Sequence, residues 1–315
     1  MTQNRLCLLN VFMLNLLLIL MHSAFLFTAV ENTSPLQQDT TSQALIVCGW
    51  DEIYVLDLTD EALAAPPKTW HWKGKECLTL PEKYRGLFGS TDDCKPMNGK
   101  GQILISSSAS GVVLVERKTK EALFYANVKN AHSAEMLPGN RIVVAASTNP
   151  KGNRLVLFDV SQSDKPLWYD ELYSAHGVVW DAKRQILWAL GYDQLRAYHL
   201  ADWDSATPKL TRVATYVLPD EQGHDLQAVP KNNTLLITTH SHVYLFDRER
   251  HMFTLHPQLK DKARIKSVSI NPKTGQLAYT QAEGQNWWTE HIHFLNPSAA
   301  ISLPNERIYK VRWDH

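Results

Sequence analysis

The sequence has no excess of charge of either sign, because 32 lysines and arginines balance 32 aspartates and glutamates. It therefore lacks the basic field that attracts nucleic acid and the acidic surplus of a solvating tail. Cysteine is scarce as well. After residue 30 only Cys48, Cys77 and Cys94 remain, an odd number without a C-x-x-C spacing. This pattern indicates neither a disulfide framework nor a cysteine-rich zinc site, and suggests at most one bridge and one free thiol.

Long hydrophobic runs are absent except at the N-terminus, where an apolar run from Leu6 to Val30 follows Arg5. Such a segment predicts export to the periplasm or beyond the cell. Residues 1–30 are interpreted as a signal peptide or an N-terminal anchor, because the run is long enough to span a bilayer. Residues 31–43 form a polar linker, and residues 44–315 form a single domain. Membrane contact is expected only through the N-terminal segment, if it is not cleaved.

Helical periodicity of useful length is missing after residue 43, whereas a short pattern recurs about every 44 residues. A polar or charged residue, here called the leader, precedes apolar residues two and four places later, often with proline six places later. The leaders are Asp92, His132, His176, His224, Lys266 and Tyr309. Their steps of 40, 44, 48, 42 and 43 residues match a four-stranded propeller blade. We therefore predict an all-β fold, a β-propeller of six blades.

The two ends of the repeat array complement each other. The first repeat, Ala44 to Asp57, begins at a second strand and has no leader, whereas residues 309–313 form a lone first strand. Pairing the C-terminal strand with the first blade would remove a free sheet edge. We predict that this pairing closes the ring.

The leaders and the loops that join the second and third strands are expected at the same end of the central channel. Neutral imidazoles on separate rigid strands suit a divalent metal, with manganese, calcium or zinc as the candidates. The predicted metal ligands are His132, His176, His224 and His242. Histidine is also the commonest general acid or base, so proton transfer without a metal is the alternative for this cluster.

Five side chains near the channel mouth are candidates for proton transfer, namely Lys266, Tyr309, Glu135, Asp92 and His240. Among them, Asp92 and Glu135 are the first acids to consider for hydrolysis, which needs two carboxyls flanking the bond. Aromatic residues in loops on the same face are predicted to stack on a sugar ring. These substrate-binding candidates are Trp50, Tyr192, Trp287 and Trp288, with packing under a long loop as the alternative for the last two.

Four stretches resemble an uncharacterised family of secreted bacterial propeller proteins: NAHSAEMLP at 130–138, YSAHGVVWD at 173–181, GHDL at 223–226 and TTHSHV at 238–243. This resemblance extends over everything after about residue 44. More remotely, histidines on a propeller axis, including the H-x-H element of His240 and His242, resemble oligogalacturonate lyase. That enzyme holds manganese with histidines and cleaves uronate oligosaccharides by β-elimination. It has seven blades rather than six, so the second likeness concerns architecture only.

Together these features predict a periplasmic or secreted carbohydrate-active enzyme, a metal-assisted lyase acting on uronate-containing oligosaccharides at the propeller axis. A glycoside hydrolase of the same glycans and a non-catalytic propeller that binds a glycan or protein are the alternatives. No organic cofactor is expected, because the tryptophan-docking repeat and disulfide pair of cofactor-dependent propeller dehydrogenases are missing.

Overall fold

The computed structural model describes residues 43–58 and 66–315. The predicted signal or anchor segment, residues 1–30, and nearly all of the linker lie outside the described residues, so export stays a prediction. Within the described ranges, no helix is long and apolar enough to cross a membrane.

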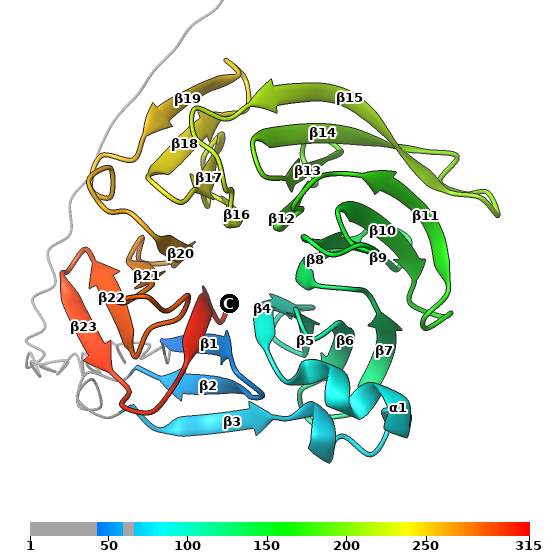
Figure 1. The fold of residues 1–315 in the computed structure, drawn as a ribbon, viewed down its shortest axis with the longest axis horizontal. Coiled ribbons are helices and arrows are strands. Elements are labelled where there is room, and N and C mark those ends of the chain that lie inside the picture. Colours follow the sequence, from blue (N-terminus) through cyan, green and yellow to red (C-terminus); the bar gives the residue numbers. More distant parts are fainter. Residues whose placement is uncertain (1–42, 59–65) are drawn as a thin grey trace, which may run out of the picture. The chain divides into compact units, whose positions relative to one another are not determined.

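Six antiparallel sheets of four strands each surround a central axis, as Figure 1 shows. The predicted six-bladed β-propeller is confirmed. Blade 1 consists of β24 (Ile308–Trp313), β1 (Ala44–Gly49), β2 (Ile53–Asp57) and β3 (Lys68–Trp72). Blade 2 consists of β4 (Thr91–Met97), β5 (Gln102–Ser107), β6 (Gly111–Glu116) and β7 (Ala122–Asn127). Blade 3 consists of β8 (Ala131–Leu137), β9 (Arg141–Ala146), β10 (Arg154–Asp159) and β11 (Pro166–Glu171).

The second half of the ring repeats this arrangement. Blade 4 consists of β12 (Gly177–Asp181), β13 (Ile186–Leu190), β14 (Gln194–Ala201) and β15 (Lys209–Val217). Blade 5 consists of β16 (Asp225–Ala228), β17 (Thr234–Thr238), β18 (Val243–Asp247) and β19 (Met252–Leu255). Blade 6 consists of β20 (Ile265–Ile270), β21 (Leu277–Gln281), β22 (His291–Leu295) and β23 (Ala299–Ser302).

The hydrophobic core lies between neighbouring blades, because the middle strands of each sheet are buried on both faces. In β1, for example, all six residues are buried. Aromatic side chains make several of the contacts between blades: Phe124 packs on Phe158 with ring centroids 5.6 Å apart, and Trp188 packs on Phe246 at 5.5 Å. Each sheet therefore depends on its neighbours for burial, and the ring stabilises all six together.

The chain termini of this domain meet in blade 1. The strand β24 pairs antiparallel with β1, with Leu45 opposite Trp313 and Val47 opposite Val311. The predicted closure of the ring by the C-terminal strand is confirmed, and residues more than 260 positions apart become neighbours in one sheet.

A short insertion between blades 1 and 2 departs from the all-β expectation. It contains the 3-10 helices η2 (Gly74–Glu76) and η3 (Gly86–Phe88) and one turn of α-helix, α1 (Glu82–Arg85). Phe88 packs edge-on against Trp72 at 5.1 Å and fixes the insertion to blade 1. Elements of three or four residues are too short to produce a helical period, so the sequence pattern could not reveal them.

Candidate functional site

A β-bulge recurs at the start of the innermost strand in four blades, and its extra residue is the leader. In β4 the pairing with β5 passes from Thr91 to Asp93 and leaves out Asp92. The same omission falls on His132 in β8, Lys266 in β20 and Tyr309 in β24. A bulge bends the strand and re-aims the side chain of the extra residue. The local backbone therefore turns these four leaders toward the channel.

The other two leaders stand one residue before their strands in a similar arrangement. The N–H of His176 donates to the carbonyl oxygen of Leu190 at 2.9 Å, although Gly177 is the residue that pairs with Leu190. The N–H of His224 donates to the carbonyl oxygen of Thr238 at 2.8 Å in the same way. All six blades thus present their leader with a closely related backbone geometry.

The six leaders converge on one cavity at the channel mouth, called here the axial cavity, with a volume of about 290 Å³. Trp287, from the loop after β21, forms part of its wall, and Ser108 and Asn130 complete the lining. This volume lies at the lower end of the range for small-molecule sites. It suits one sugar ring or a similarly small group.

The three histidines form a continuous row across the axial cavity. The ring centroids of His132 and His176 are 4.2 Å apart, and those of His176 and His224 are 5.4 Å apart. Nδ1 of His176 lies 2.8 Å from the carbonyl oxygen of Ser174 and donates its proton there, which leaves the lone pair on Nε2. Burial lowers the pKa of His176 well below 6.5, and His132 and His224 lower it further. His176 is therefore neutral at neutral pH.

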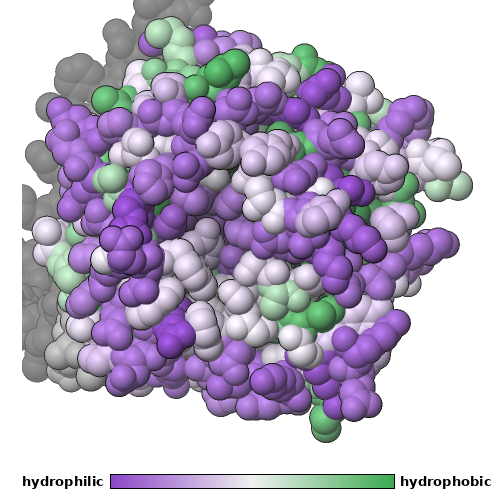
Figure 2. Space-filling model, viewed as in Figure 1, coloured by the Kyte–Doolittle hydropathy of each residue, from purple (hydrophilic) through white to green (hydrophobic). Residues whose placement is uncertain are grey.

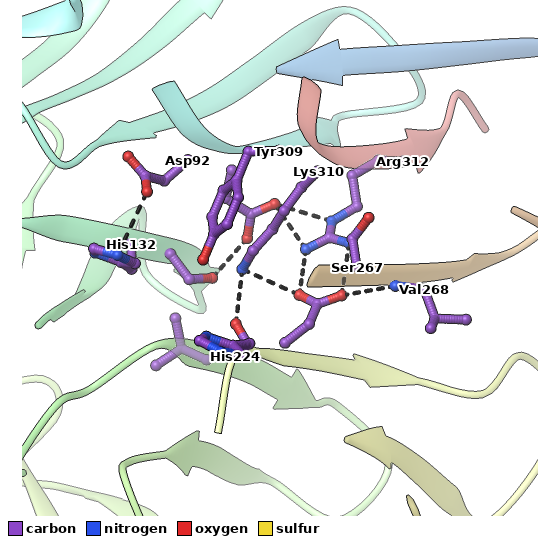
Figure 3. A network of polar contacts seen from close by, with 12 residues as sticks. Asp92, His132, His224, Ser267, Val268, Tyr309, Lys310 and Arg312 are labelled. Carbon is purple, nitrogen blue, oxygen red and sulfur yellow. Dashed lines mark hydrogen bonds and ion pairs between the residues drawn. The ribbon is translucent and has the colours of Figure 1, made fainter. Parts of the chain in front are cut away.

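Asp92 and His132 face each other, with Oδ1 and Nε2 3.5 Å apart (Figure 3). Burial raises the pKa of Asp92, and the nearby His132 opposes part of that rise. Burial lowers the pKa of His132, and the Asp92 carboxylate opposes part of that fall. The two pKa values move toward each other, so a proton passes between these side chains more readily than between an isolated aspartate and histidine.

Lys266 is the cationic group of the axial cavity. Its ammonium Nζ lies 2.9 Å from Nε2 of His224 and donates to that lone pair. Burial lowers the pKa of Lys266 to about 8, and the neighbouring charges of Arg264 and Lys310 contribute. Burial, followed by Lys266 and Lys310, also lowers the pKa of His224 well below 6.5. At neutral pH the pair carries one positive charge, located mainly on the lysine.

The four predicted metal ligands do not come together as one donor set in the described residues. In the described ranges, no group of three histidine, cysteine, aspartate or glutamate side chains has the spacing of metal ligands. The lone pair of His224 that a metal would need accepts from the Lys266 ammonium instead. His242, the fourth predicted ligand, does not line the axial cavity. A divalent ion therefore stays a prediction of the sequence.

Three predicted residues lie away from the axial cavity. His242 is on the rim, where its Nδ1 contacts Asp220 Oδ2 at 2.6 Å, and its neighbour His240 is exposed. Glu135 lies further down the channel, where its carboxylate accepts from Lys95 at 2.9 Å. The predicted pairing of Asp92 with Glu135 for hydrolysis is therefore not available in this cavity, because only Asp92 lines it.

The four predicted aromatic residues divide into two groups. Trp50 and Trp287 stack with centroids 6.1 Å apart and an angle of 17° between their planes, and Trp288 joins them through Arg307, whose guanidinium is 5.3 Å from its ring. Tyr192 lies in blade 4 instead, where it packs against Tyr173 at 5.4 Å. Its hydroxyl donates to Glu221 at 2.9 Å.

A layer of buried charge beneath the leaders was not predicted. Arg312 donates to Asp93 at 2.9 Å and to Asp225 at 2.6 Å, and so connects strands of three different blades. Lys310 lies 3.2 Å from Asp225 and donates to the carbonyl oxygen of His224 at 3.0 Å. Figure 3 shows Tyr309 beside Lys310 and this network around Arg312. The network fills the channel under the cavity with charges that balance one another.

A signal for this layer does exist in the repeat. The first and third residues after a leader are polar or charged in most blades, as in Asp93 with Lys95 and Lys310 with Arg312. Strict strand alternation would place a leader and its successor on opposite faces. The bulge brings both to the channel side, so the polar residues at these positions share one environment.

A comparison with known protein families matches residues 36–315 to the family described as "Family of unknown function (DUF6528)". No curated protein matches the chain. The match covers the whole propeller, which is the extent that the predicted resemblance had; the secretion implied by that resemblance stays a prediction.

Proposed function

Since the chain belongs to this family of unknown function, we propose a function from its axial cavity: the protein binds the carboxylate of an acidic sugar there and cleaves the glycan by β-elimination. The observation that carries this proposal is the delivery of six chemically active leaders to one cavity by six separate blades. Groups held on rigid strands are pre-organised for catalysis, because little reorganisation is needed when the reaction occurs.

Lys266 is the group proposed to bind the carboxylate. It is a buried cation in a cavity whose histidines are neutral. A charge-assisted hydrogen bond from this ammonium would hold the carboxylate and stabilise the negative charge that develops on it during elimination.

His176 and Tyr309 are proposed to transfer the protons. Nε2 of His176 carries a free lone pair and takes the proton from the carbon next to the carboxylate. The electrons of that C–H bond form a carbon–carbon double bond, and the glycosidic C–O bond on the adjacent carbon breaks. Burial raises the pKa of Tyr309 well above 10, and Asp92 and Asp225 raise it further, so the hydroxyl holds a proton for the leaving oxygen.

The affinity for a carboxylate ligand should fall as pH rises above 8. Binding needs the ammonium form of Lys266, whose pKa of about 8 is well below the ordinary 10.5. The association constant should then fall about tenfold per pH unit above pH 8. Titration calorimetry with glucuronate at pH 6 to 10 measures this. Lys266→Arg should abolish the decline, because arginine stays protonated throughout. A flat wild-type profile up to pH 10 would contradict the assignment.

Elimination itself is tested by screening uronate oligosaccharides with the full chain for the ultraviolet absorbance of an unsaturated product. His176→Asn should lower kcat about 10²- to 10⁴-fold, which is the usual contribution of a general base, while ligand binding persists. His199→Asn is the matched control, because that histidine is exposed on β14 and distant in sequence from every leader. It should leave kcat unchanged.

Three outcomes would count against elimination carried out by these protein groups. New reducing ends without an absorbing product would indicate hydrolysis. Saturable binding of acidic sugars without turnover would indicate a non-catalytic glycan-binding propeller. Activity that appears only with an added divalent ion, and disappears with a chelator, would show that a metal supplies chemistry assigned here to protein groups.

A further inference from the structure

A second cavity of about 350 Å³ lies beside the axial cavity, over blade 1, and is called here the outer cavity. The turn between β1 and β2 supplies Trp50, Asp51 and Glu52, and the segment before β24 supplies Glu306 and Arg307. The two cavities adjoin at β24, because Ile308 lines the outer cavity and its neighbour Tyr309 lines the axial one.

Two tryptophans form the wall between the cavities. Trp50 lines the outer cavity and Trp287 lines the axial cavity, and the two rings stack on each other. Trp287 in turn packs edge-on against Tyr309, with centroids 5.4 Å apart. A row of aromatic rings therefore leads from a leader on the axis to the outer cavity. Large side chains left 40% and 43% exposed, as Trp287 and Trp50 are, mark a binding surface when they stand together.

The backbone holds Trp50 in a fixed orientation. The guanidinium of Arg307 lies 4.1 Å from the ring of Trp50 and 5.3 Å from the ring of Trp288. The backbone of Arg307 also passes so close to the end of β1 that position 49 must be glycine. A Cβ on residue 49 would lie 1.8 Å from the carbonyl oxygen of Arg307. The Trp50 ring is thus pre-organised by a cation–π contact before any ligand arrives.

The outer cavity is rich in charge but close to neutral. Lys68 bridges Glu52 and Glu306, with Nζ at 2.9 Å and 2.7 Å from their carboxylates, and Lys73 lies 3.7 Å from Asp51. These carboxylates are paired with the two lysines and still accept hydrogen bonds from hydroxyl groups. The exposed part of Trp50, beside such acceptors, suits an uncharged polyol ring, whereas the Lys266 ammonium gives the axial cavity a cation for an acidic one.

We propose that the outer cavity is a second sugar subsite, which binds an uncharged sugar unit linked to the acidic unit in the axial cavity. This proposal rests on the proposed function for the identity of the first unit. It makes the substrate a mixed glycan, in which acidic and neutral sugars alternate or meet, rather than a chain of uronates only.

The test compares three ligands by titration calorimetry with the full chain: glucuronate, a disaccharide of glucuronate linked to glucose, and digalacturonate. The mixed disaccharide should bind about three- to tenfold more tightly than glucuronate, a gain of the size expected for one stacking contact. Trp50→Ala should remove this gain, and Trp50→Phe should keep most of it. Tyr169→Ala is the matched control, because Tyr169 is an exposed aromatic residue on β11, in blade 3. This variant should leave the affinities for all three ligands unchanged.

The outcomes separate the two proposals. If glucuronate binds but Trp50→Ala keeps the disaccharide gain, or if digalacturonate binds more tightly than the mixed disaccharide, the second subsite is wrong and the proposed function stands. If no acidic sugar binds, the proposed function fails. The outer cavity is then judged with cellobiose alone: saturable quenching of tryptophan fluorescence that Trp50→Ala abolishes would support a neutral-sugar site, and its absence would overturn one.

Discussion

Deletion of residues 308–315 should leave no folded monomer in solution. These residues contain the whole of β24, the innermost strand of blade 1, and without it β1 would expose an unpaired edge along the channel. The deletion also removes Trp313, which is almost fully buried, and Arg312, which connects three blades. Size-exclusion chromatography and near-ultraviolet circular dichroism of the truncated chain measure the result. We expect aggregates without a cooperative thermal transition.

A shorter deletion provides the control. Removing His315 alone keeps β24 intact and preserves the ion pair of Asp314 with Arg117 at 2.8 Å. That variant should fold and unfold like the full chain. Removing eight of the 315 residues leaves a chain of 307. If that chain is monomeric and unfolds cooperatively near the temperature of the full chain, β24 is not needed to close the ring.

Substituting Arg312 with Met should lower the free energy of unfolding by about 3–5 kcal/mol, the usual cost of breaking a buried ion pair. The variant leaves the carboxylates of Asp93 and Asp225 in the channel without their main partner. Both carboxylates are almost fully buried, so water cannot replace the guanidinium. Urea denaturation monitored by tryptophan fluorescence provides the measurement.

An exposed ion pair supplies the contrast for this variant. Lys209 and Asp202 are 2.6 Å apart, the same separation as Arg312 and Asp225, but both are about half exposed. Lys209→Met should therefore cost less than about 1 kcal/mol. The double variant Arg312→Met with Asp225→Asn should lose less than the sum of the two single variants, because the second change removes a charge that the first leaves unpaired. A loss of under 1 kcal/mol for Arg312→Met would show that the network contributes little.

The same network sets the response to acid. Burial alone would raise the pKa of Asp225, but Arg312 and Lys310 hold it at about 2, below the ordinary value of 3.8. Because the folded pKa is the lower one, this stabilisation is present above pH 3.8 and is lost as pH falls toward 2. The free energy of unfolding of the wild type should fall between pH 3.8 and pH 2. It should fall less in Arg312→Met, because that variant lacks the ion pair with Asp225 at every pH.

The repeat revealed most of the fold, because each blade restates the same pattern at a nearly constant step. Leaders as different as Asp92, Lys266 and Tyr309 lie at one mouth, as the repeat predicts, since their register in the repeat, not their chemistry, determines where they lie. Periodicity could not reveal the helical insertion at 74–88, because its elements occur once and are short.

The departures in the candidate site have local causes. His242 looked like a ligand from its H-x-H spacing, but it binds Asp220, which lies 22 residues earlier in the connection before β16, and no sequence pattern links the two. Glu135 follows a leader by three residues and so lies deeper in the channel, with Lys95 as its partner. Side-chain contacts between separate blades form only when the ring closes. The pattern of a single repeat therefore cannot predict them.

The bulged leaders also make this scaffold a modular one. In four blades the ladder omits the leader, so its side chain can be exchanged while the pairing of its neighbours stays as it is. The leaders, which face the cavity, are thus different positions from the paired residues, which hold the blades together. A protein engineer could therefore randomise these codons while the pairing of the neighbouring residues is kept.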